Sequence, residues 1–268
     1  MLKARVLTAL ALLGALLLAL FLLPEAGWAF IVAALVGVAG WEWGGLAGFD
    51  RVARVAYGAS LSAVVVVLTL IRIDASALPW VLYGLACAFW LAAVPAWLVR
   101  KWRLANPLVG ALVGALVLVP PGFAMLQLRA LSPLLLLAVL SAVWVADIAA
   151  YFSGRAFGRN KLAPQISPGK TWEGAAGAVV GVVGYYFLLA AAFKPAGLGE
   201  GVLWPVVALA LFTAVSICGD LFESLLKRQA GVKDSGQMLP GHGGILDRID
   251  SLTSTLPFVG LVVLSWRG

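Results

Sequence analysis

The sequence carries very little charge. Only 12% of its 268 residues are Asp, Glu, Lys or Arg, whereas soluble domains carry roughly 25%. Hydrophobic residues make up 63% of the chain, and the mean hydropathy is +1.02. This composition excludes an ordinary soluble domain and indicates an integral membrane protein.

Cysteine and histidine are also scarce. The chain has two cysteines and one histidine. Cys87 and Cys218 both fall inside apolar segments, and their spacing matches neither a zinc-binding motif nor a disulfide framework. We interpret both as small buried hydrophobic side chains.

Long apolar runs dominate what is present. A bilayer-spanning helix needs about 20 mostly apolar residues, whereas the strands of a membrane β-barrel would alternate over about 10 residues. The runs here are continuous, so we predict an all-α polytopic integral membrane protein with about nine transmembrane helices. The expected spans lie near residues 6–23, 27–44, 53–71, 78–99, 106–122, 132–152, 172–193, 203–222 and 251–266.

These spans predict a single membrane-embedded domain over residues 1–268. We expect N-terminal helices over about 1–122 and a catalytic part over about 132–268. The first apolar run follows Lys3 and Arg5 but lacks a convincing small-residue cleavage site. We therefore interpret it as a transmembrane helix and not as a signal peptide.

The distribution of Lys and Arg predicts the orientation, because cytoplasmic loops carry an excess of these residues. With a cytoplasmic N-terminus, 15 of the 19 fall on the cytoplasmic side. The four on the other side are Arg72, Arg129, Lys194 and Arg267. An odd number of helices then places the C-terminus outside. It also puts both long polar loops, 153–171 and 223–250, on the cytoplasmic face, where nucleotides could reach them.

Two carboxylates stand at the ends of apolar spans. Asp220 lies at the end of the eighth span and Asp247 just before the ninth. A carboxylate near a membrane boundary is costly and usually has a partner. Oxygen ligands without nearby Cys or His suit a hard cation such as Mg²⁺. Pairing with Arg228 and Arg248 would explain the same two acids without a metal, and spacing alone leaves both alternatives open.

Further polar residues accompany these two acids. Ser224 and Lys227 follow Asp220 at helical spacing, so the three could share one face of a helix. Asp250 could share a face with Asp247, where acids also suit the dipole of a helix N-terminus. The basic residues of the segment are Lys227, Arg228, Lys233 and Arg248. Alternating acids and bases favour a metal-plus-phosphate site, although positive-inside bias or anionic lipid also explains any single base.

The only histidine, His242, stands beside Gly241 and before Gly243 and Gly244. Glycines allow a backbone to approach a ligand closely. Two interpretations stay open for His242: a hydrogen bond within the loop, or phosphate contact and acid–base chemistry.

A second polar segment runs over residues 147–174. Asp147 lies within the sixth apolar span, where an ionisable residue is a functional-site hypothesis by default. The seventh span contains Gly177 and Gly181, a GxxxG pattern that we interpret as close helix packing.

Within this segment, Gly169-Lys170-Thr171 resembles the last three residues of a P-loop motif. The motif needs a Gly where Pro164 stands, and we expect no strand before it, so the P-loop interpretation fails. We expect a loop entering the seventh helix, where free N–H groups and Lys170 could bind an anion. Capping of that helix by Ser167 or Thr171 is compatible with the same residues.

The segment 224–250 resembles the signature of phosphatidate cytidylyltransferases (CDP-diacylglycerol synthases), membrane enzymes that join CTP to phosphatidic acid. The matching residues are Ser224, Lys227, Arg228, Lys233, Asp234, Gly236, Leu239, Pro240, His242, Gly243, Gly244, Asp247, Arg248 and Asp250. The segment 147–174 is similar to a second family segment that ends in S-P-x-K-T-x-E-G and includes Glu173. Gly169 departs from it where many relatives have a basic residue, which puts one phosphate contact in doubt.

This resemblance implies transfer of the cytidylyl group of CTP to phosphatidic acid. It implies that Asp220 and Asp247 hold Mg²⁺, with room for a second cation such as K⁺, and it implies a homodimer. Contacts to CTP or lipid phosphate would come from Ser167, Lys170, Thr171, Lys227, Arg228 and Arg248. We expect a multi-pass protein of the cell inner membrane, with its active site facing the cytoplasm and no nucleic-acid partner.

The predicted site therefore has two sets of residues. The catalytic set is Asp220, Asp247, Lys227, Arg228 and Asp250. The substrate-binding set is Asp147, Ser167, Lys170, Thr171, Glu173, Ser224, Lys233, Asp234, His242 and Arg248.

Two other functional classes remain as alternatives. A CTP-dependent polyprenol or dolichol kinase would transfer the γ-phosphoryl group, but the 224–250 motif argues against it. An anion or metabolite transporter would place its charges near the bilayer midplane, in broken helices often related by a repeat. In this sequence the charges crowd one face and no convincing repeat is found.

Overall fold

The computed structural model of the protein describes residues 2–71, 77–193, 202–239, 241 and 243–267. Over these residues the chain forms nine helical rods and one short hairpin, if α4, a π-helical turn and α5 are counted as one rod. The rods are α1 (Leu2–Leu22), α2 (Glu25–Leu46), α3 (Arg51–Leu70), α4 (Leu78–Ala88) with the π-helical turn Phe89–Ala93 and α5 (Val94–Arg100), α6 (Pro107–Leu131), α7 (Pro133–Phe157), α8 (Trp172–Phe193), α9 (Leu203–Gln229) and α10 (Leu246–Arg267).

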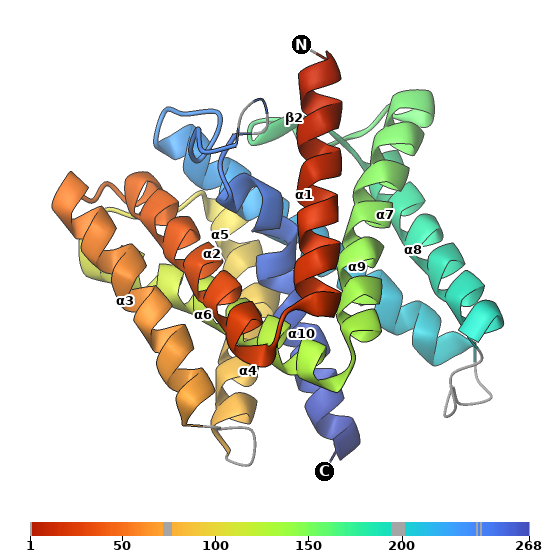
Figure 1. The fold of residues 1–268 in the computed structure, drawn as a ribbon. Coiled ribbons are helices and arrows are strands. Elements are labelled where there is room, and N and C mark those ends of the chain that lie inside the picture. The colour runs from red at the N-terminus through yellow and green to blue at the C-terminus, as the bar shows by residue number, and fades with distance from the viewer. Residues whose placement is uncertain (1, 72–76, 194–201, 240, 242, 268) are drawn as a thin grey trace.

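The rods agree with the predicted spans in number and order. Within the described residues, eight helices are long and apolar enough to cross a membrane, and the apolar part of α1, Thr8–Leu22, is shorter. This confirms the all-α polytopic fold class. The N-terminal and C-terminal ends lie at opposite ends of the bundle (Figure 1).

Three of the helices, α3, α6 and α7, begin at a residue whose side chain caps the helix. Asp50 Oδ1 accepts the Ala53 N–H at 2.8 Å before α3, and Ser132 Oγ accepts the Leu135 N–H at 3.3 Å before α7. Pro133 occupies the first turn of α7. Such residues satisfy or remove the N–H groups that a helix start leaves without partners.

Helix α6 is longer than the sequence predicts. It continues through Pro120 and Pro121 to Leu131, whereas we expected the span to end near residue 122. Both prolines are buried, and a Cβ on Gly122 would lie only 2.7 Å from a methyl of Val36 in α2. Neighbouring helices therefore hold this backbone in helical form although proline removes a hydrogen bond.

The two polar segments are shorter than expected because helices extend into them. Helix α7 continues to Phe157, α9 continues to Gln229, and α10 begins at Leu246. The connections between helices therefore shrink to residues 158–171 and 230–245. Several predicted site residues consequently lie on rigid helix ends and not in loops.

The connection between α7 and α8 forms a hairpin of β1 (Lys161–Ala163) and β2 (Ser167–Thr171). The strands are antiparallel, with Lys161 opposite Thr171 and Ala163 opposite Ser167. Our expectation of no strand before the seventh helix was wrong at this point. The strand S-P-G-K-T has almost none of the β-branched and aromatic residues that favour strands, so its pairing leaves no signal in the sequence.

Helix α10 lies at the centre of the bundle, in contact with α2, α4, α6, α7 and α9 (Figure 1). Its buried face combines leucines with hydroxyl residues. Ser254 Oγ donates to the Val215 carbonyl of α9 at 2.9 Å, and a Cβ on Gly219 would lie 2.5 Å from that hydroxyl oxygen. The start of α10 is therefore fixed relative to most of the other helices.

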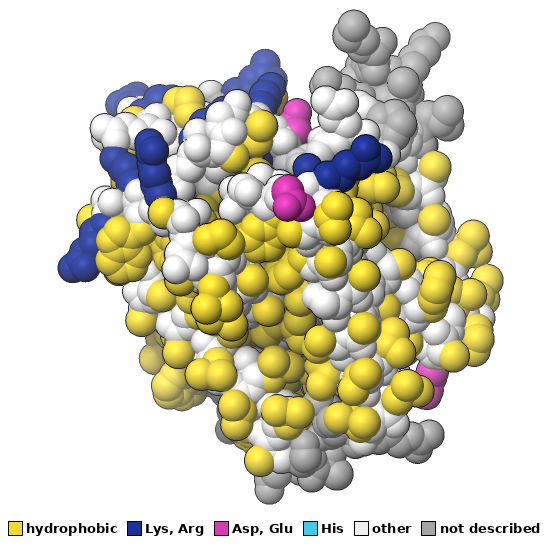
Figure 2. All heavy atoms as spheres, turned by 90° about the vertical axis from the view of Figure 1, so that its left-hand side faces the viewer, with side chains coloured by type: hydrophobic (Ala, Val, Ile, Leu, Met, Phe, Trp, Pro, Cys, Tyr) yellow, Lys and Arg dark blue, Asp and Glu magenta, His cyan; other side chains and the backbone are white. Residues whose placement is uncertain are grey.

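Basic side chains gather at one end of the molecule. Figure 2 shows Lys and Arg side chains along the upper edge and a largely hydrophobic surface below it. In Figure 1 the N-terminus and the hairpin lie at this same end. A hydrophobic surface beneath a basic edge suits a protein that meets lipid along its sides and water at this end.

Helices α7 and α8 pack closely through the predicted GxxxG pattern. A Cβ on Gly177 would lie 2.0 Å from Oγ and 2.4 Å from Cβ of Ser153, and one on Gly181 would lie 2.6 Å from Cβ of Ala149. Small residues let two membrane helices approach in this way. The packing interpretation is confirmed.

We predict that Gly177→Ala destabilises the protein by about 1–3 kcal/mol, because the added methyl group overlaps Ser153. Gly184→Ala is the matched control on the same helix, since a Cβ there meets no atom within 4 Å. Its effect should stay within about 0.5 kcal/mol. Equilibrium unfolding in mixed detergent micelles, followed by tryptophan fluorescence, measures both. Equal stability of the two variants would contradict the close α7–α8 contact.

Candidate active site

A cavity of about 470 Å³ lies between α7, α8, α9 and the hairpin. Small residues of α7 and α8 form its apolar wall, among them Ala146, Ala150, Gly174 and Ala178. Five predicted site residues also line it: Asp147, Ser167, Lys170, Thr171 and Asp220. The fold thus brings the two polar segments of the sequence to one cavity.

Asp220 and Lys170 form the charged pair of this cavity. The Lys170 ammonium lies 2.5 Å from Oδ2 of Asp220, and the two side chains are 25% and 29% exposed. Ser224 donates to Oδ1 of Asp220 at 3.1 Å, one helical turn along α9. The predicted shared face of Asp220 and Ser224 is therefore present, and it carries a carboxylate that remains accessible from the cavity.

Two further carboxylates lie within electrostatic range of Asp220. Asp147, from α7, lines the cavity and interacts with the charges of Asp220, Lys170 and Arg248. Asp250, from α10, also interacts with Asp220 and Asp147, and its Oδ1 accepts the Ser251 N–H at 2.7 Å. Acids from α7 and α10 therefore lie within electrostatic range of Asp220 in α9, and Lys170 is the cation bonded to it.

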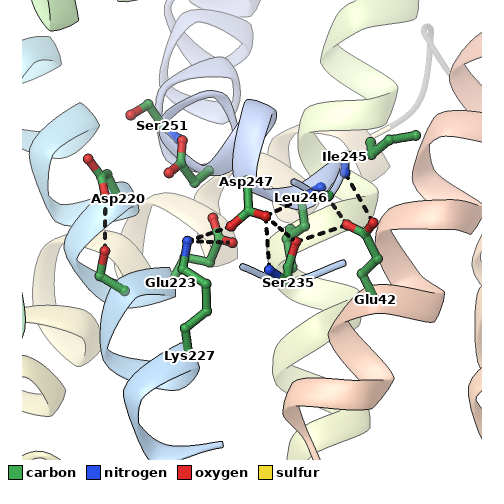
Figure 3. A network of polar contacts seen from close by, with 12 residues as sticks. Glu42, Asp220, Glu223, Lys227, Ser235, Ile245, Leu246, Asp247 and Ser251 are labelled. Atoms are coloured by element: carbon green, nitrogen blue, oxygen red, sulfur yellow. Dashed lines mark hydrogen bonds and ion pairs between the residues drawn. The ribbon is translucent and has the colours of Figure 1, made fainter. Parts of the chain in front are cut away.

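A second polar cluster surrounds Lys227 (Figure 3). Its ammonium lies 2.6 Å from Oδ1 of Asp247 and 3.2 Å from Oε1 of Glu223. The lysine side chain is 13% exposed and each of the two acids only 4%. Burial of two carboxylates around one ammonium is costly for any member left alone, so Lys227 ties the end of α9 to the start of α10.

The other oxygen of Asp247 is also fully engaged. Oδ2 accepts the Ser235 N–H at 2.9 Å, the Ser235 hydroxyl at 3.0 Å and the Gly244 N–H at 2.8 Å. Asp247 therefore organises the connection 230–245. The alternative interpretation without a metal paired this carboxylate with Arg228 or Arg248. Asp247 instead forms its ion pair with Lys227.

Three residues of this cluster were missed by the sequence analysis: Glu42, Glu223 and Ser235. Glu42 is a single acid within an apolar span of α2, and Figure 3 shows it on the opposite side of Ser235 from Asp247. An ionisable residue inside a membrane span marks a functional hypothesis, and that signal could have identified Glu42. Ser235 carries no comparable signal, since an isolated serine in a loop is common.

A profile of the Cytidylyltransferase family matches residues 3–266 of the chain. The chain belongs to this family. It is 41% identical over 266 residues to a phosphatidate cytidylyltransferase of Pseudomonas aeruginosa, covering 96% of this chain and 95% of the relative. A protein of the same name from Haemophilus influenzae is 37% identical over 284 residues, covering 96% and 97%. One from Thermotoga maritima is 47% identical over 124 residues, about 45% of this chain.

The remaining predicted residues of this family member fall into two groups. Arg228, Lys233, Asp234 and Arg248 are exposed at the basic end. Others already serve the fold: Thr171 Oγ1 accepts the Gly174 N–H at 3.1 Å and caps α8, and Glu173 accepts Asn160 Nδ2 at 2.8 Å across the hairpin. The capping interpretation of Thr171 is thus confirmed. His242 lies outside the described residues.

The predicted magnesium ligands, Asp220 and Asp247, belong to different clusters and each contacts a lysine. Within the described ranges, no group of three or more Asp, Glu, His or Cys side chains is arranged to hold a metal ion. Magnesium, however, usually takes one or two carboxylates and completes its shell with water and substrate phosphates. Asp220 fits that role because it faces the cavity, whereas Asp247 would have to exchange Lys227 for the ion.

We predict that Lys227→Met lowers the free energy of unfolding by about 3–5 kcal/mol, because it leaves two buried carboxylates without their cation. Arg228→Met is the matched control, since Arg228 is the next residue of α9 and is exposed; its effect should be within about 0.5 kcal/mol. Unfolding in mixed detergent micelles measures both. A Lys227→Met protein as stable as Arg228→Met would contradict the buried pairing.

Proposed function

We propose that the protein transfers the cytidylyl group of CTP to phosphatidic acid, which yields CDP-diacylglycerol and pyrophosphate. The observation that carries the proposal is the cavity with Lys170 and Asp220 at its polar side and small apolar residues of α7 and α8 along its wall. Such a cavity suits an amphipathic phosphate ester. The family match over residues 3–266 and the relatives named phosphatidate cytidylyltransferase support the same reaction.

In the proposed reaction, an oxygen of the lipid phosphate attacks the α-phosphorus of CTP, the new P–O bond forms, and pyrophosphate leaves with the electrons of the broken bond. The lipid phosphate is already an anion, so no strong general base is needed. Catalysis then depends on positioning and on neutralising phosphate charge. Lys170 is the proposed contact to CTP phosphate, and the exposed Arg228, Lys233 and Arg248 are proposed contacts to phosphates from the aqueous side.

Magnesium remains part of the proposal, with Asp220 and Asp247 as the residues that would hold it and with room for a second cation such as K⁺. A bound Mg²⁺ would supply positive charge to the phosphates of CTP. The accessible carboxylate of Asp220 and its neighbours Asp147 and Asp250 support this assignment.

We also propose that the basic end of the molecule faces the cytoplasm of a cell whose inner membrane holds the protein. The gathering of Lys and Arg at one end supports this orientation (Figure 2). The lipid acyl chains would then remain in the bilayer beside α7 and α8 while the headgroup enters the cavity. A homodimer is carried over from the family resemblance.

The central test incubates detergent-purified protein with Mg²⁺, phosphatidic acid and CTP labelled in the α-phosphate. Label should move into the lipid fraction with matching release of pyrophosphate. Asp247→Asn should remove nearly all turnover in a folded protein, because the residue loses the charge that Lys227 and the 230–245 connection require. Asp50→Asn is the control carboxylate, since asparagine caps α3 equally well.

Absence of lipid label from folded protein, with several phosphatidic acids, would contradict the proposed reaction. Transfer of label from γ-labelled CTP to a polyprenol would favour the kinase class. Uptake of an unchanged anion into proteoliposomes would favour the transporter class. Near-normal activity in Asp247→Asn would remove Asp247 from the active site.

We further predict that Lys170→Ala raises KM for CTP about tenfold or more, because a hydrogen bond from an ammonium to phosphate contributes roughly 1.5–3 kcal/mol. Lys161→Ala, at an exposed lysine of the same hairpin, should leave KM within about twofold. Steady-state kinetics with each substrate varied in turn separates the two constants. A change confined to KM for phosphatidic acid would show that Lys170 binds the lipid and not CTP.

A further inference from the structure

The N-terminus of α10 is capped by a side chain from another helix. Glu42, in α2, accepts the Leu246 N–H at Oε2 over 2.7 Å and the Ile245 N–H at Oε1 over 3.1 Å. A helix start leaves such N–H groups without partners in its own backbone, and a negative charge there also suits the helix dipole. A residue some 200 positions away in the chain therefore fixes where the helix carrying Asp247 begins.

The surroundings of Glu42 are shaped to its carboxylate. Glu42 has 0% exposure. A Cβ on Gly236 would lie 2.3 Å from Oε1 of Glu42, and a Cβ on Gly244 would lie 2.5 Å from Oε2. Any residue other than glycine at these two positions would collide with it. Because a buried carboxylate is costly without hydrogen bonds, the two backbone N–H donors of Ile245 and Leu246 support the burial of Glu42.

Ser235 joins Glu42 to Asp247 (Figure 3). Its hydroxyl oxygen lies 3.0 Å from Oε2 of Glu42 and 3.0 Å from Oδ2 of Asp247. A hydroxyl has one proton to donate, so it donates to one of the two carboxylates at a time, and both carboxylates compete for it. The N–H groups of Ser235 and Gly244 hold the same Oδ2, which leaves Oδ1 of Asp247 directed to Lys227 at 2.6 Å.

We propose that Glu42 is a positioning residue for cytidylyl transfer, acting through Ser235 and the start of α10 on the carboxylate of Asp247. The inference rests on the function proposed above. Catalysis that depends on positioning is sensitive to small shifts, since a displacement of about 1 Å can lower a rate about 100-fold. Mutation of a residue that orients a ligating or catalytic group through a hydrogen bond typically lowers activity about 10–100-fold.

The first test is Glu42→Gln, which keeps the side-chain size and replaces one acceptor oxygen by an amide donor that faces backbone N–H groups. The kcat for transfer of α-label from CTP to phosphatidic acid should fall about 10–100-fold. KM for each substrate should stay within about threefold, because Glu42 touches neither substrate. Glu25→Gln, at an exposed acid in the first turn of the same helix, should retain the wild-type kcat.

The second variant is Ser235→Ala, which is needed because Glu42→Gln also weakens the cap of α10 and lowers stability. Ser235→Ala removes the bridging hydroxyl but leaves the two backbone bonds from Ile245 and Leu246 to Glu42 in place. Its kcat should fall about tenfold, with an unfolding midpoint close to the wild type. In the double variant the two losses should not multiply, because both act through one bridge.

Wild-type kcat per folded molecule in Ser235→Ala and in Glu42→Gln would overturn the inference while the proposed function stands. Losses that multiply in the double variant would overturn the bridge as the route of action. If the wild-type protein transfers no label to phosphatidic acid, the proposed function fails and the inference fails with it. The wild-type rate therefore distinguishes failure of the proposed function from failure of the inference.

Discussion

The polar end of this bundle depends on the requirement that a buried charge have a partner. Lys227 is enclosed with Glu223 and Asp247, whose side chains are each 4% exposed. Removal of Lys227 would leave these two buried carboxylates without a cation. The three residues therefore fix α9 and α10 in one arrangement at the level where the 230–245 connection leaves the bundle. The cavity beside Asp220 is lined in part by α9 and by Ser251 of α10, so this pairing fixes one side of it.

Carboxylates also replace local caps in this structure. The start of α10 has its N–H groups satisfied by Glu42 from α2 and by Asp247 from its own first turn. A division into N-terminal helices and a catalytic part therefore does not describe how the polar cluster is built, because α2 supplies one of its acids. The parts are joined by hydrogen bonds and by the apolar core, whose residues run from Ala19 to Leu264.

Much of the fold could be predicted from the sequence, because apolar length alone marks a membrane helix. The ends of the helices were less accessible to prediction. Pro120 and Pro121 signal a break, yet packing against neighbouring helices keeps α6 helical through them. The approach of Lys170 to Asp220 joins β2 to α9, 50 positions apart, and no periodic pattern in the sequence encodes such a contact. Glu42 is further still along the chain from its partners Ile245 and Leu246. The only sequence feature that pointed to Glu42 was the presence of an acid within an apolar span.

The glycines of the 236–244 segment have a different use from the one that the sequence suggested. Gly241, Gly243 and Gly244 were interpreted as places where the backbone approaches a ligand, and Gly236 was noted only as part of the family signature. At Gly236 and Gly244 the group that approaches is Glu42, and at Gly243, where φ is +81°, a Cβ would lie 2.8 Å from Oδ2 of Asp247. Part of the family signature thus serves internal carboxylates. The bases of the same signature, Arg228, Lys233 and Arg248, are exposed. In the proposed reaction they would meet the anionic substrate from the aqueous side, while Gly236, Gly243 and Gly244 leave room for the buried acids.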